Sequence, residues 1–248
     1  MDSNKKVALV TGGGRGLGRS ISMELATSGV SVMLTYIHDK ASALSTTKAI
    51  LDTGGYASCI QMDVCNRKSV TKAVNRCVNH FGSLDILINN AGFNIPTDFD
   101  QINDDEWDKV LDINLKGPFI CSQVAMPFLS RRPGSNILNI GSISGQYGGP
   151  RTAHYAASKA GLISLGQVIA RFGARSGVRC NTIAAGLFES TMAKEGLESP
   201  IVKQASKDIL LKRLGKPLEL AKAVVFITSD DASYITGQTI NVNGGLLF

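Results

Sequence analysis

Short apolar, β-branched runs alternate along the chain with longer amphipathic segments. The runs are almost continuously hydrophobic, which is typical of parallel strands buried on both faces. The pattern predicts seven strands, at Val7–Thr11, Ser31–Tyr36, Ser58–Met62, Ile86–Asn89, Ile137–Ile140, Val178–Ile183 and Thr239–Val242. It predicts helices at Leu17–Ser28, Ala41–Thr53, Lys68–Phe81, Asp104–Leu129, Tyr155–Arg175 and Leu218–Ser229, with a shorter helix at Ile201–Leu210.

Strands that alternate with helices through short connections form right-handed βαβ units. We therefore predict an α/β protein with a doubly wound, mostly seven-stranded parallel sheet and helices on both faces. The chain has no domain-sized linker, internal repeat or low-complexity tract, so residues 1–248 are expected to form one domain. Two irregular segments, Phe93–Asn103 and Gly186–Ser199, follow strands and are expected at the carboxyl edge of the sheet, where such folds bind ligands.

Composition narrows the class of protein. The 248 residues are 44% hydrophobic and 19% charged, which is enough for a substantial core. No apolar run approaches the roughly 20 residues of a membrane span. The polar start, Met1–Lys6, leaves no room for a targeting peptide, so we expect a cytoplasmic protein. The odd number of cysteines, five, together with the lack of a targeting peptide, indicates reduced thiols. The cysteines form no C-x-x-C pair and the three histidines have no ligand-like spacing, which argues against a metal site.

The net charge of +6 makes nucleic acid a partner to consider. The densest basic group, Lys203–Lys222, also contains acidic residues and lacks the interleaved aromatic residues that stack on bases. A solvated basic face is the simplest interpretation, an anionic substrate or acidic carrier protein is the alternative, and nucleic acid is the least favoured.

A glycine-rich segment, Thr11–Gly18, joins the first predicted strand to the first predicted helix. Glycines there allow a tight turn and let a pyrophosphate approach the backbone, while the helix N-terminus supplies N–H groups and a favourable dipole. The spacing Gly-x-x-x-Gly-x-Gly differs from the common G-x-G-x-x-G fingerprint, although the strand before it and the helix after it fit the same use. We expect a dinucleotide to contact Gly12, Arg15, Gly16, Leu17 and Gly18.

The residue type at the end of the second predicted strand distinguishes NAD-binding sites from NADP-binding sites. NAD sites place an acidic residue there to hold the ribose 2′-hydroxyl. This chain has Tyr36 at that position, and Asp39 comes three residues later, too late for the role. The guanidinium of Arg15 could instead grip a 2′-phosphate, assisted by Lys40 or His38. We therefore predict NADP(H) as the cofactor.

Two later strand ends extend the expected site. Asp63 and Val64 follow the third strand, where a carboxylate could accept a hydrogen bond from the adenine amino group. Asn90, Ala91 and Gly92 close the fourth strand, where small residues let the chain pass close to the adenosine ribose. Each could be ordinary turn chemistry, but at successive strand ends they outline one extended ligand.

Tyr155 and Lys159 lie four residues apart in a predicted helix, which puts both side chains on one face. A free tyrosine has a pKa of about 10, and a neighbouring Lys⁺ lowers it. Such a tyrosine is an effective general acid or base near neutral pH. The same spacing also occurs by chance in amphipathic helices, so the pair carries weight only together with the other motifs.

These motifs resemble those of the short-chain dehydrogenase/reductase family over nearly the whole chain. The likeness is carried, in the family's order and approximate spacing, by Thr11–Gly18, Asn89–Gly92, Asn114, Ser142 and Tyr155–Lys159. It implies a Rossmann fold that binds NAD(P), with Tyr155 and Lys159 also contacting the cofactor.

The resemblance also implies a catalytic tetrad. Asn114 would help to hold a water that relays protons through Lys159. Ser142 would hydrogen-bond the substrate carbonyl, and Tyr155 would give or take the proton. Lys159 would lower the tyrosine pKa and bind the nicotinamide ribose.

After the sixth predicted strand the chain departs from the family pattern of Pro-Gly followed by Thr. It has Ala185, Gly186 and, four residues later, Ser190. The resemblance still puts Gly186, the Phe188 backbone and Ser190 at the nicotinamide. Loss of the proline removes a φ restraint, so a substrate loop at about 186–212 is expected to differ from that of relatives.

Within the family the likeness is greatest to 3-oxoacyl-acyl-carrier-protein reductases, on residues 213–217, 232–238 and 242–245. It implies an NADPH-dependent carbonyl reductase of a ketone, for which a 3-oxoacyl thioester on carrier protein or coenzyme A is one candidate. The alternative is a reductase or dehydrogenase of another secondary alcohol, with a pocket built from 93–99, 143–152 and 188–197 and His154 just beyond. A catalytically inactive nucleotide sensor is less favoured, because it would show an eroded tetrad.

The resemblance further implies a homotetramer. Family members commonly associate through the helices at Asp104–Leu129 and Tyr155–Arg175 and through the C-terminal segment. If the substrate is bound to an acidic carrier, basic side chains could contact that carrier, at Arg171, Arg175, Lys203 and Lys207.

Overall fold

A seven-stranded, all-parallel sheet forms the centre of the computed structural model, which describes residues 5–189 and 207–248. The strands lie in the order β3-β2-β1-β4-β5-β6-β7. Their bounds are β1 Val7–Val10, β2 Ser31–Tyr36, β3 Ala57–Gln61, β4 Ile86–Asn89, β5 Asn136–Ser142, β6 Arg179–Ala185 and β7 Thr239–Val242. The strand order reverses between β1 and β4, which is the point where an open α/β sheet leaves a crevice for a ligand.

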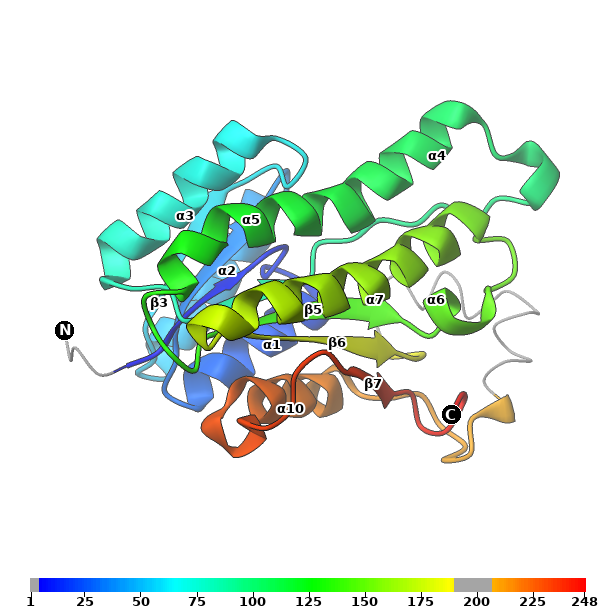
Figure 1. Cartoon of the computed structure of the whole chain (residues 1–248). Helices are drawn as coiled ribbons and strands as arrows, with labels where there is room; N and C mark the ends of the chain where they lie inside the picture. Colours follow the sequence, from blue (N-terminus) through cyan, green and yellow to red (C-terminus); the bar gives the residue numbers. More distant parts are fainter. Residues whose placement is uncertain (1–4, 190–206) are drawn as a thin grey trace.

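Helices cover both faces of this sheet (Figure 1). They are α1 Gly16–Thr27, α2 Lys40–Asp52, α3 Arg67–Phe81, α4 Asp104–Leu111, α5 Gly117–Leu129, α6 Ser144–Tyr147, α7 Ala153–Gly173 and α10 Pro217–Thr228. Short 3₁₀ turns lie at η1 Phe99–Gln101, η3 Ala174–Ser176 and η4 Asp230–Ala232, and a π-helical turn lies at η2 Asp112–Lys116. The predicted fold class, a doubly wound parallel sheet with helices on both faces, is confirmed.

Two hydrophobic cores explain why the strands are almost continuously apolar. Successive residues of one strand point to opposite faces, so Leu9 enters the core under α3, α5 and α7, while Val10 enters the core over α1, α2 and α10. Both residues are fully buried. A strand that is buried on both sides has no position left for an exposed polar side chain.

The predicted helix Asp104–Leu129 is divided in the structure. α4 and α5 follow one another through the π turn η2, and Asn114 lies in that turn. A π turn inserts one extra residue and often marks a functional site. The hydrophobic pattern continues through it, because the insertion rotates the helix face without interrupting the helix.

Two strands are longer than predicted, because small residues extend them without an apolar signal. β5 continues through Gly141 to Ser142, and β6 continues to Ala185 in register with it. A Cβ at position 141 would lie 3.0 Å from the Ile183 carbonyl oxygen, so the close approach of the two strands requires glycine. The short helix α6 was not predicted. The predicted helix Ile201–Leu210 begins outside the described residues.

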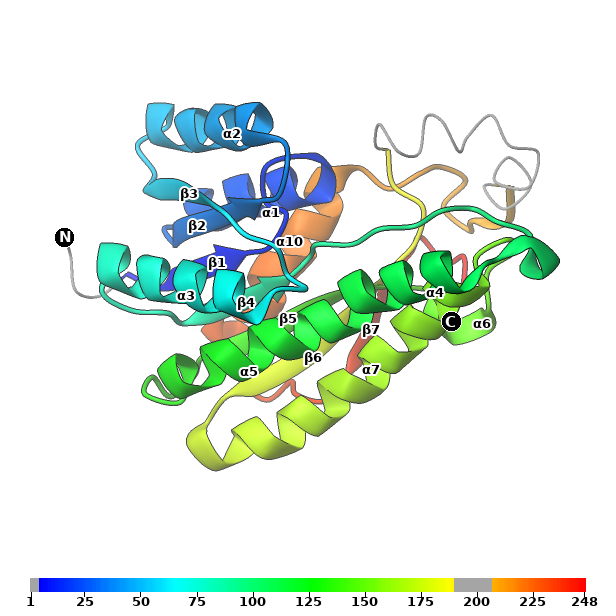
Figure 2. The same cartoon turned by 90° about the horizontal axis from the view of Figure 1, so that it is seen from above.

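The carboxyl ends of the strands form one edge of the molecule. α6 and the C-terminal segment lie at this edge (Figure 1). The view from above shows α2 and β3 toward one end of the sheet and α7 toward the other (Figure 2). In the described parts of the chain, no helix is both long and apolar enough to cross a lipid bilayer.

Candidate functional site

The glycine-rich segment forms a tight loop between β1 and α1. Gly12 and Gly16 have φ angles of +62° and +54°, which side chains other than glycine rarely adopt. A Cβ at Gly18 would lie 2.2 Å from the Gly12 carbonyl oxygen, so the loop closes on α1 only with glycine there. Arg15 is the N-cap of α1 but provides no side-chain cap. The first N–H groups of α1 therefore lack a side-chain acceptor and can bind an anion.

The loop is fastened to the neighbouring strand ends by two buried threonines. The Thr11 hydroxyl oxygen accepts from Asn90 N (2.9 Å) and Ala91 N (2.8 Å), and the Asn90 amide donates to the Thr11 carbonyl (2.8 Å). Thr35 Oγ1 lies 3.3 Å from Gly12 N and accepts from it. Neither threonine was among the predicted site residues. Thr11 directly precedes the glycine motif, which is the signal that could have indicated it.

The strand ends named in the sequence prediction come together along this edge. Tyr36, Asp63 and Asn90 follow or end β2, β3 and β4, which lie next to one another or next to β1 in the sheet. Asp63 uses Oδ1 to accept from Cys65 N at 2.9 Å. Val64 packs against Gly117 of α5, where a Cβ would lie 2.8 Å from its side chain. These residues thus form one continuous border on the sheet side of the expected dinucleotide.

Tyr155 and Lys159 lie one turn apart near the start of α7, as predicted. Lys159 Nζ is 5.5 Å from the centre of the Tyr155 ring and donates to the Ile140 carbonyl of β5 at 2.9 Å. The lysine is 4% exposed. Ser142 ends β5, and its hydroxyl accepts from Ser144 N at 3.1 Å. The carboxyl end of β5 and the first turns of α7 thus hold these three side chains.

Asn114 is fully buried and joins the site through its amide. Its oxygen accepts from Phe93 N (2.8 Å), and its nitrogen donates to the Phe93 carbonyl (2.7 Å) and to Ser158 Oγ (3.3 Å). Ser158 in turn donates to the Tyr155 carbonyl at 2.7 Å. Sequence reasoning missed Ser158, which connects two members of the predicted tetrad. Gly92 lies beside them, where a Cβ would be 3.3 Å from Asn114 Oδ1.

The pKa of Tyr155 differs from the sequence-based expectation. Burial raises the pKa of this phenol, and the neighbouring Ser142 hydroxyl is the group that lowers it. Burial also lowers the pKa of Lys159 to about 8. For Tyr155 the effect of burial is the larger one and its direction is opposite to the sequence-based expectation, because desolvation disfavours the charged phenolate. Tyr155 is therefore protonated at neutral pH.

The segment after β6 is described only as far as residue 189. Gly186 lies against Asn243, where a Cβ would be 2.6 Å from the Asn243 Cα. The Phe188 ring is 6% exposed and packs on Gly215, where a Cβ would lie 2.5 Å from it. Contrary to the prediction for its side chain, Phe188 belongs to the core and not to a pocket wall. Ser190 lies outside the described residues.

Two of the three predicted pocket segments meet. Thr97 N donates to the Arg151 carbonyl at 2.9 Å, which links 93–99 to 143–152. The Phe93 ring is half-buried, and Lys109 Nζ lies 4.7 Å from its centre. His154 is fully buried, and its Nδ1 accepts from Tyr155 N, so it packs behind the site and not in the pocket.

Of the basic side chains proposed for a carrier, Arg171 and Arg175 lie away from the site. Arg171 lies 16 residues after Tyr155, near the other end of α7, which corresponds to roughly 24 Å along a helix. Arg175 follows in the η3 turn. Lys203 lies outside the described residues, and Lys207 is exposed. Across residues 5–189 and 207–248, no cluster of three or more His, Cys, Asp or Glu is arranged to hold a metal ion.

Comparisons with known proteins agree with this geometry. The protein-family model described as Enoyl-(Acyl carrier protein) reductase matches residues 12–247. The chain is 40% identical to the 3-oxoacyl-(acyl-carrier-protein) reductase FabG of Staphylococcus aureus, over 97% of this chain and 98% of the relative. It is 34% identical to the 3-oxoacyl-(acyl-carrier-protein) reductase of a Synechocystis species, over 98% and 97%.

The solved structures give the same result. A mutant of a Serratia marcescens short-chain dehydrogenase/reductase superposes with a TM-score of 0.91 at 31% identity, with 97% of each chain covered. The glycine loop, the strand-end residues and the Tyr155–Lys159 pair therefore lie in a fold and a sequence that these oxidoreductases share. The chain belongs to the short-chain dehydrogenase/reductase family.

Proposed function

We propose that this oxidoreductase is an NADPH-dependent carbonyl reductase that converts a ketone to a secondary alcohol. The observation that carries the proposal is the position of the half-buried Tyr155, whose ring centre lies 5.5 Å from Lys159 Nζ and whose hydroxyl neighbours that of Ser142. Reduction of a ketone needs a proton donor at the carbonyl oxygen, and a protonated phenol provides one. All four tetrad residues are present, which disfavours an inactive nucleotide sensor.

Each tetrad residue then has a distinct role. The bound dinucleotide supplies the hydride to the carbonyl carbon. Ser142 donates a hydrogen bond to the carbonyl oxygen, and Tyr155 transfers its proton to that oxygen as negative charge develops. The Lys159 ammonium stabilises the phenolate that remains and binds the nicotinamide ribose. Asn114 anchors the segment after β4 beside Lys159 and helps to hold the water that returns a proton through this lysine.

The described residues fit a dinucleotide. The N–H groups at the start of α1 lack a side-chain acceptor and suit the pyrophosphate, together with the backbone of Gly12 and Gly16. A side chain at Gly92 would fill the space beside Asn114 and Lys159 that we assign to the nicotinamide ribose. We further assign the adenosine end to Tyr36, Asp63, Val64, Asn90 and Ala91, and the nicotinamide end to Gly186, Phe188 and Ser190.

Replacing Arg15 by alanine should weaken NADPH binding selectively. Its side chain is exposed at the glycine loop, and a guanidinium binds a phosphate through charge-assisted hydrogen bonds. Loss of one such contact is expected to raise the Kd for NADPH about 10-fold or more, with a much smaller effect on NADH. Titration of both dinucleotides by intrinsic fluorescence measures this. An equal loss for NADH would remove Arg15 from the phosphate site.

The substrate proposal rests on the relatives named above. A 3-oxoacyl thioester on carrier protein or coenzyme A is the first candidate, and another ketone of a specialised pathway is the second. NADPH oxidation at 340 nm with acetoacetyl-CoA, against a panel of cyclic and aromatic ketones, separates them. Turnover of the thioester supports the first candidate. Turnover of the other ketones alone supports the second, and no turnover of any ketone contradicts the reductase proposal.

The same proposal extends to the domain organisation, the cellular compartment and the partners of the enzyme. We regard residues 1–248 as one NAD(P)-binding domain with its substrate loop at about 186–212, of which 190–206 lie outside the described residues. All five cysteines are free, which agrees with a reducing compartment such as the cytoplasm. The partner is then a small or carrier-bound ketone, and neither nucleic acid nor a membrane is required.

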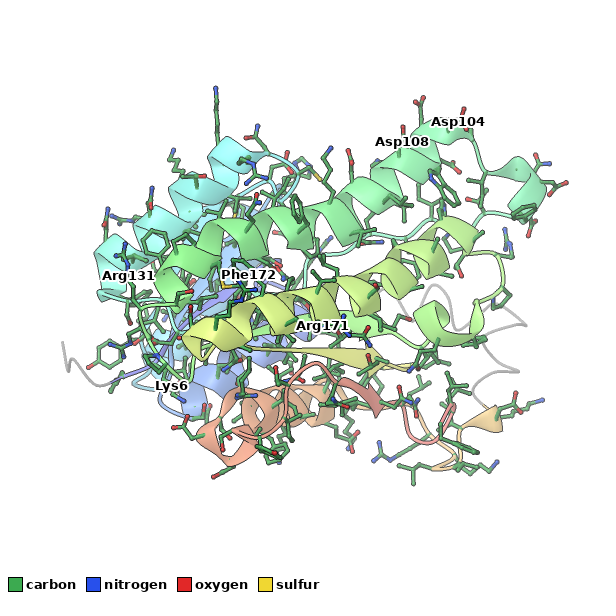
Figure 3. All side chains as sticks on the ribbon, in the orientation of Figure 1. Lys6, Asp104, Asp108, Arg131, Arg171 and Phe172 are labelled. Atoms are coloured by element: carbon green, nitrogen blue, oxygen red, sulfur yellow. The ribbon has the colours of Figure 1, made fainter. Side chains whose placement is uncertain are left out.

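We propose a homotetramer, with one interface on α4, α5 and α7. Phe119, Val168 and Phe172 on these helices are 43%, 55% and 60% exposed. Figure 3 shows Asp104 and Asp108 at one end of this face and Arg131 and Arg171 toward the other. If the two-fold axis is perpendicular to these helices, the helices of the two copies run antiparallel. The acidic end of one copy then faces the basic end of its partner. The C-terminal segment would form the second interface.

Phe172→Asp should dissociate this interface. A charged side chain in place of a buried aromatic contact typically costs 2 kcal/mol or more at the centre of an interface, so the dissociation constant should rise about 30-fold or more. Light scattering during size-exclusion chromatography measures the species formed. Leu44→Asp is the control, because Leu44 is 50% exposed on α2, away from this face. An unchanged oligomer for Phe172→Asp would contradict the proposed interface.

A further inference from the structure

The helix that carries Tyr155 begins without a cap from its N-cap side chain. Thr152 is the N-cap of α7, but its side chain makes no cap hydrogen bond. Its hydroxyl instead donates to the Gly149 carbonyl at 2.9 Å, within the turn that leads from α6 into α7 (Figure 1). That turn is tight, because a Cβ at Gly149 would lie 2.9 Å from Ser144 Oγ. The first N–H groups of α7 therefore have no acceptor in the N-cap side chain.

His154 supplies an acceptor to one of these groups. Its Nδ1 accepts from Tyr155 N at 2.9 Å. In the described part of the chain, Tyr155 N is the only N–H group of residues 153–155 that has a side-chain acceptor. The carbonyl of the same residue accepts from Ser158 Oγ at 2.7 Å. Both polar groups of the Tyr155 backbone are thus bonded to side chains of fully buried residues, His154 and Ser158.

Packing alone does not account for a histidine at position 154. A ring nitrogen that accepts from an N–H uses its lone pair, so the proton of the neutral imidazole lies on Nε2. Within residues 5–189 and 207–248, this buried Nε2 has no hydrogen-bond partner. A buried donor without a partner destabilises a fold. A leucine would fill a similar space without that penalty, but it could not accept from Tyr155 N.

We propose that His154 is a positioning residue for proton transfer: by accepting from Tyr155 N, it fixes the first turn of α7 so that the Tyr155 phenol points to Ser142 and to the carbonyl oxygen of the substrate. The phenol hydroxyl neighbours that of Ser142 in this structure. His154 is buried behind the site and acts only through the Tyr155 backbone. The inference rests on the proposed function, because it assigns a role in the proposed reaction.

His154→Asn and His154→Leu separate positioning from packing. The amide oxygen of asparagine is attached to Cγ, as Nδ1 is in histidine, so it can accept from Tyr155 N. Leucine cannot accept, but it fills the space better and removes the unpartnered donor. The leucine variant should lose about 10- to 100-fold in kcat, because a misplacement of about 1 Å can cost about 100-fold. The asparagine variant should keep kcat within about 3-fold of the wild type, although its Tm should be the lower of the two.

Two further variants serve as controls. His154→Gln is also polar, but its amide is one bond further from the backbone and reaches the place of Nε2 and not that of Nδ1. Its kcat should fall as in the leucine variant. His80→Leu makes the same replacement in the last turn of α3, at the other edge of the sheet, and should leave kcat unchanged.

The measurements are kcat, KM and the Kd of NADPH, with the ketone of the panel that the wild type reduces. KM and the Kd of NADPH should change less than kcat, because the proposed role concerns the orientation of the proton donor. Hydrogen exchange at Tyr155 N reports the cap directly and does not depend on turnover. This amide should exchange faster in His154→Leu than in the wild type and in His154→Asn.

Three results would overturn the inference. They are a kcat of His154→Leu within about 3-fold of the wild type, losses of kcat that follow Tm across the three His154 variants, or unchanged exchange of Tyr155 N in His154→Leu. In each case ketone reduction by the wild type would leave the proposed function intact. If the wild type reduces no ketone of the panel, the proposed function is wrong and the inference fails with it.

Discussion

Tyr155→Phe is expected to lower kcat for ketone reduction by about 1,000-fold. The substitution removes only the hydroxyl, and general acid catalysis by a positioned side chain typically contributes factors of 10²–10⁴. The ring remains packed near Lys159 Nζ, 5.5 Å from its centre in the wild type, so NADPH binding should be largely retained. Steady-state kinetics together with a direct titration of NADPH separates loss of chemistry from loss of binding.

Tyr234→Phe is the matched control for this experiment, because Tyr234 is fully exposed and should be neutral to the change. Turnover by Tyr155→Phe comparable to that of the wild type would exclude Tyr155 as the proton donor. A large loss of NADPH affinity with an unchanged kcat would give it a binding role instead.

Lys159→Met is expected to abolish turnover and to stabilise the fold. Burial lowers the pKa of Lys159 from 10.5 to about 8, so the native state holds the ammonium at a cost of about 3 kcal/mol at pH 7. Methionine removes this cost but leaves the Ile140 carbonyl without its donor, which offsets about 1–2 kcal/mol. The free energy of unfolding of the variant, measured by denaturant titration at pH 7, should therefore be about 1–2 kcal/mol higher than that of the wild type.

The pH dependence identifies the cause of this gain. Between pH 8 and 10.5 the unfolded wild type binds more protons than the native state, so its stability rises with pH relative to the variant. The advantage of Lys159→Met should thus be full below pH 8 and shrink toward pH 10.5. Lys48→Met, at an exposed position, should show no such trend. A difference between Lys159→Met and wild type that is constant across this range would contradict a buried ammonium as the source.

The strands and helices were predictable wherever burial leaves a periodic signal. β2, β4 and β7 have the predicted bounds, and most helices begin or end within one residue of the prediction. The signal fails at Gly141–Ser142 and Ala184–Ala185, where small residues extend β5 and β6. It also fails at η2, because a π turn changes hydrogen bonding but not the apolar content of the helix.

The candidate site could be predicted as a set of residues but not as a set of contacts. The glycine loop, Tyr155 and Lys159 have local signatures, because a tight turn or one helical turn determines their spacing. Thr35 and Ser158 have none, since each acts through a hydrogen bond to a distant segment. For Phe188 the prediction was wrong in the opposite way, because a residue expected in the pocket lies in the core. An apolar side chain suits a pocket wall and a core equally well, and the structure buries this one against Gly215.

The sequence by itself determined the parallel sheet, the order of its elements and the identity of the motif residues, because periodicity and glycine geometry are local properties. Only the tertiary structure decided the charge states and the neighbours of those residues. Burial raises the pKa of Tyr155 where the local spacing predicted a lower one, because desolvation depends on everything packed around the pair. The contact of Gly14 with Ala43 of α2 was equally hidden from the sequence, because it joins surfaces that are distant along the chain.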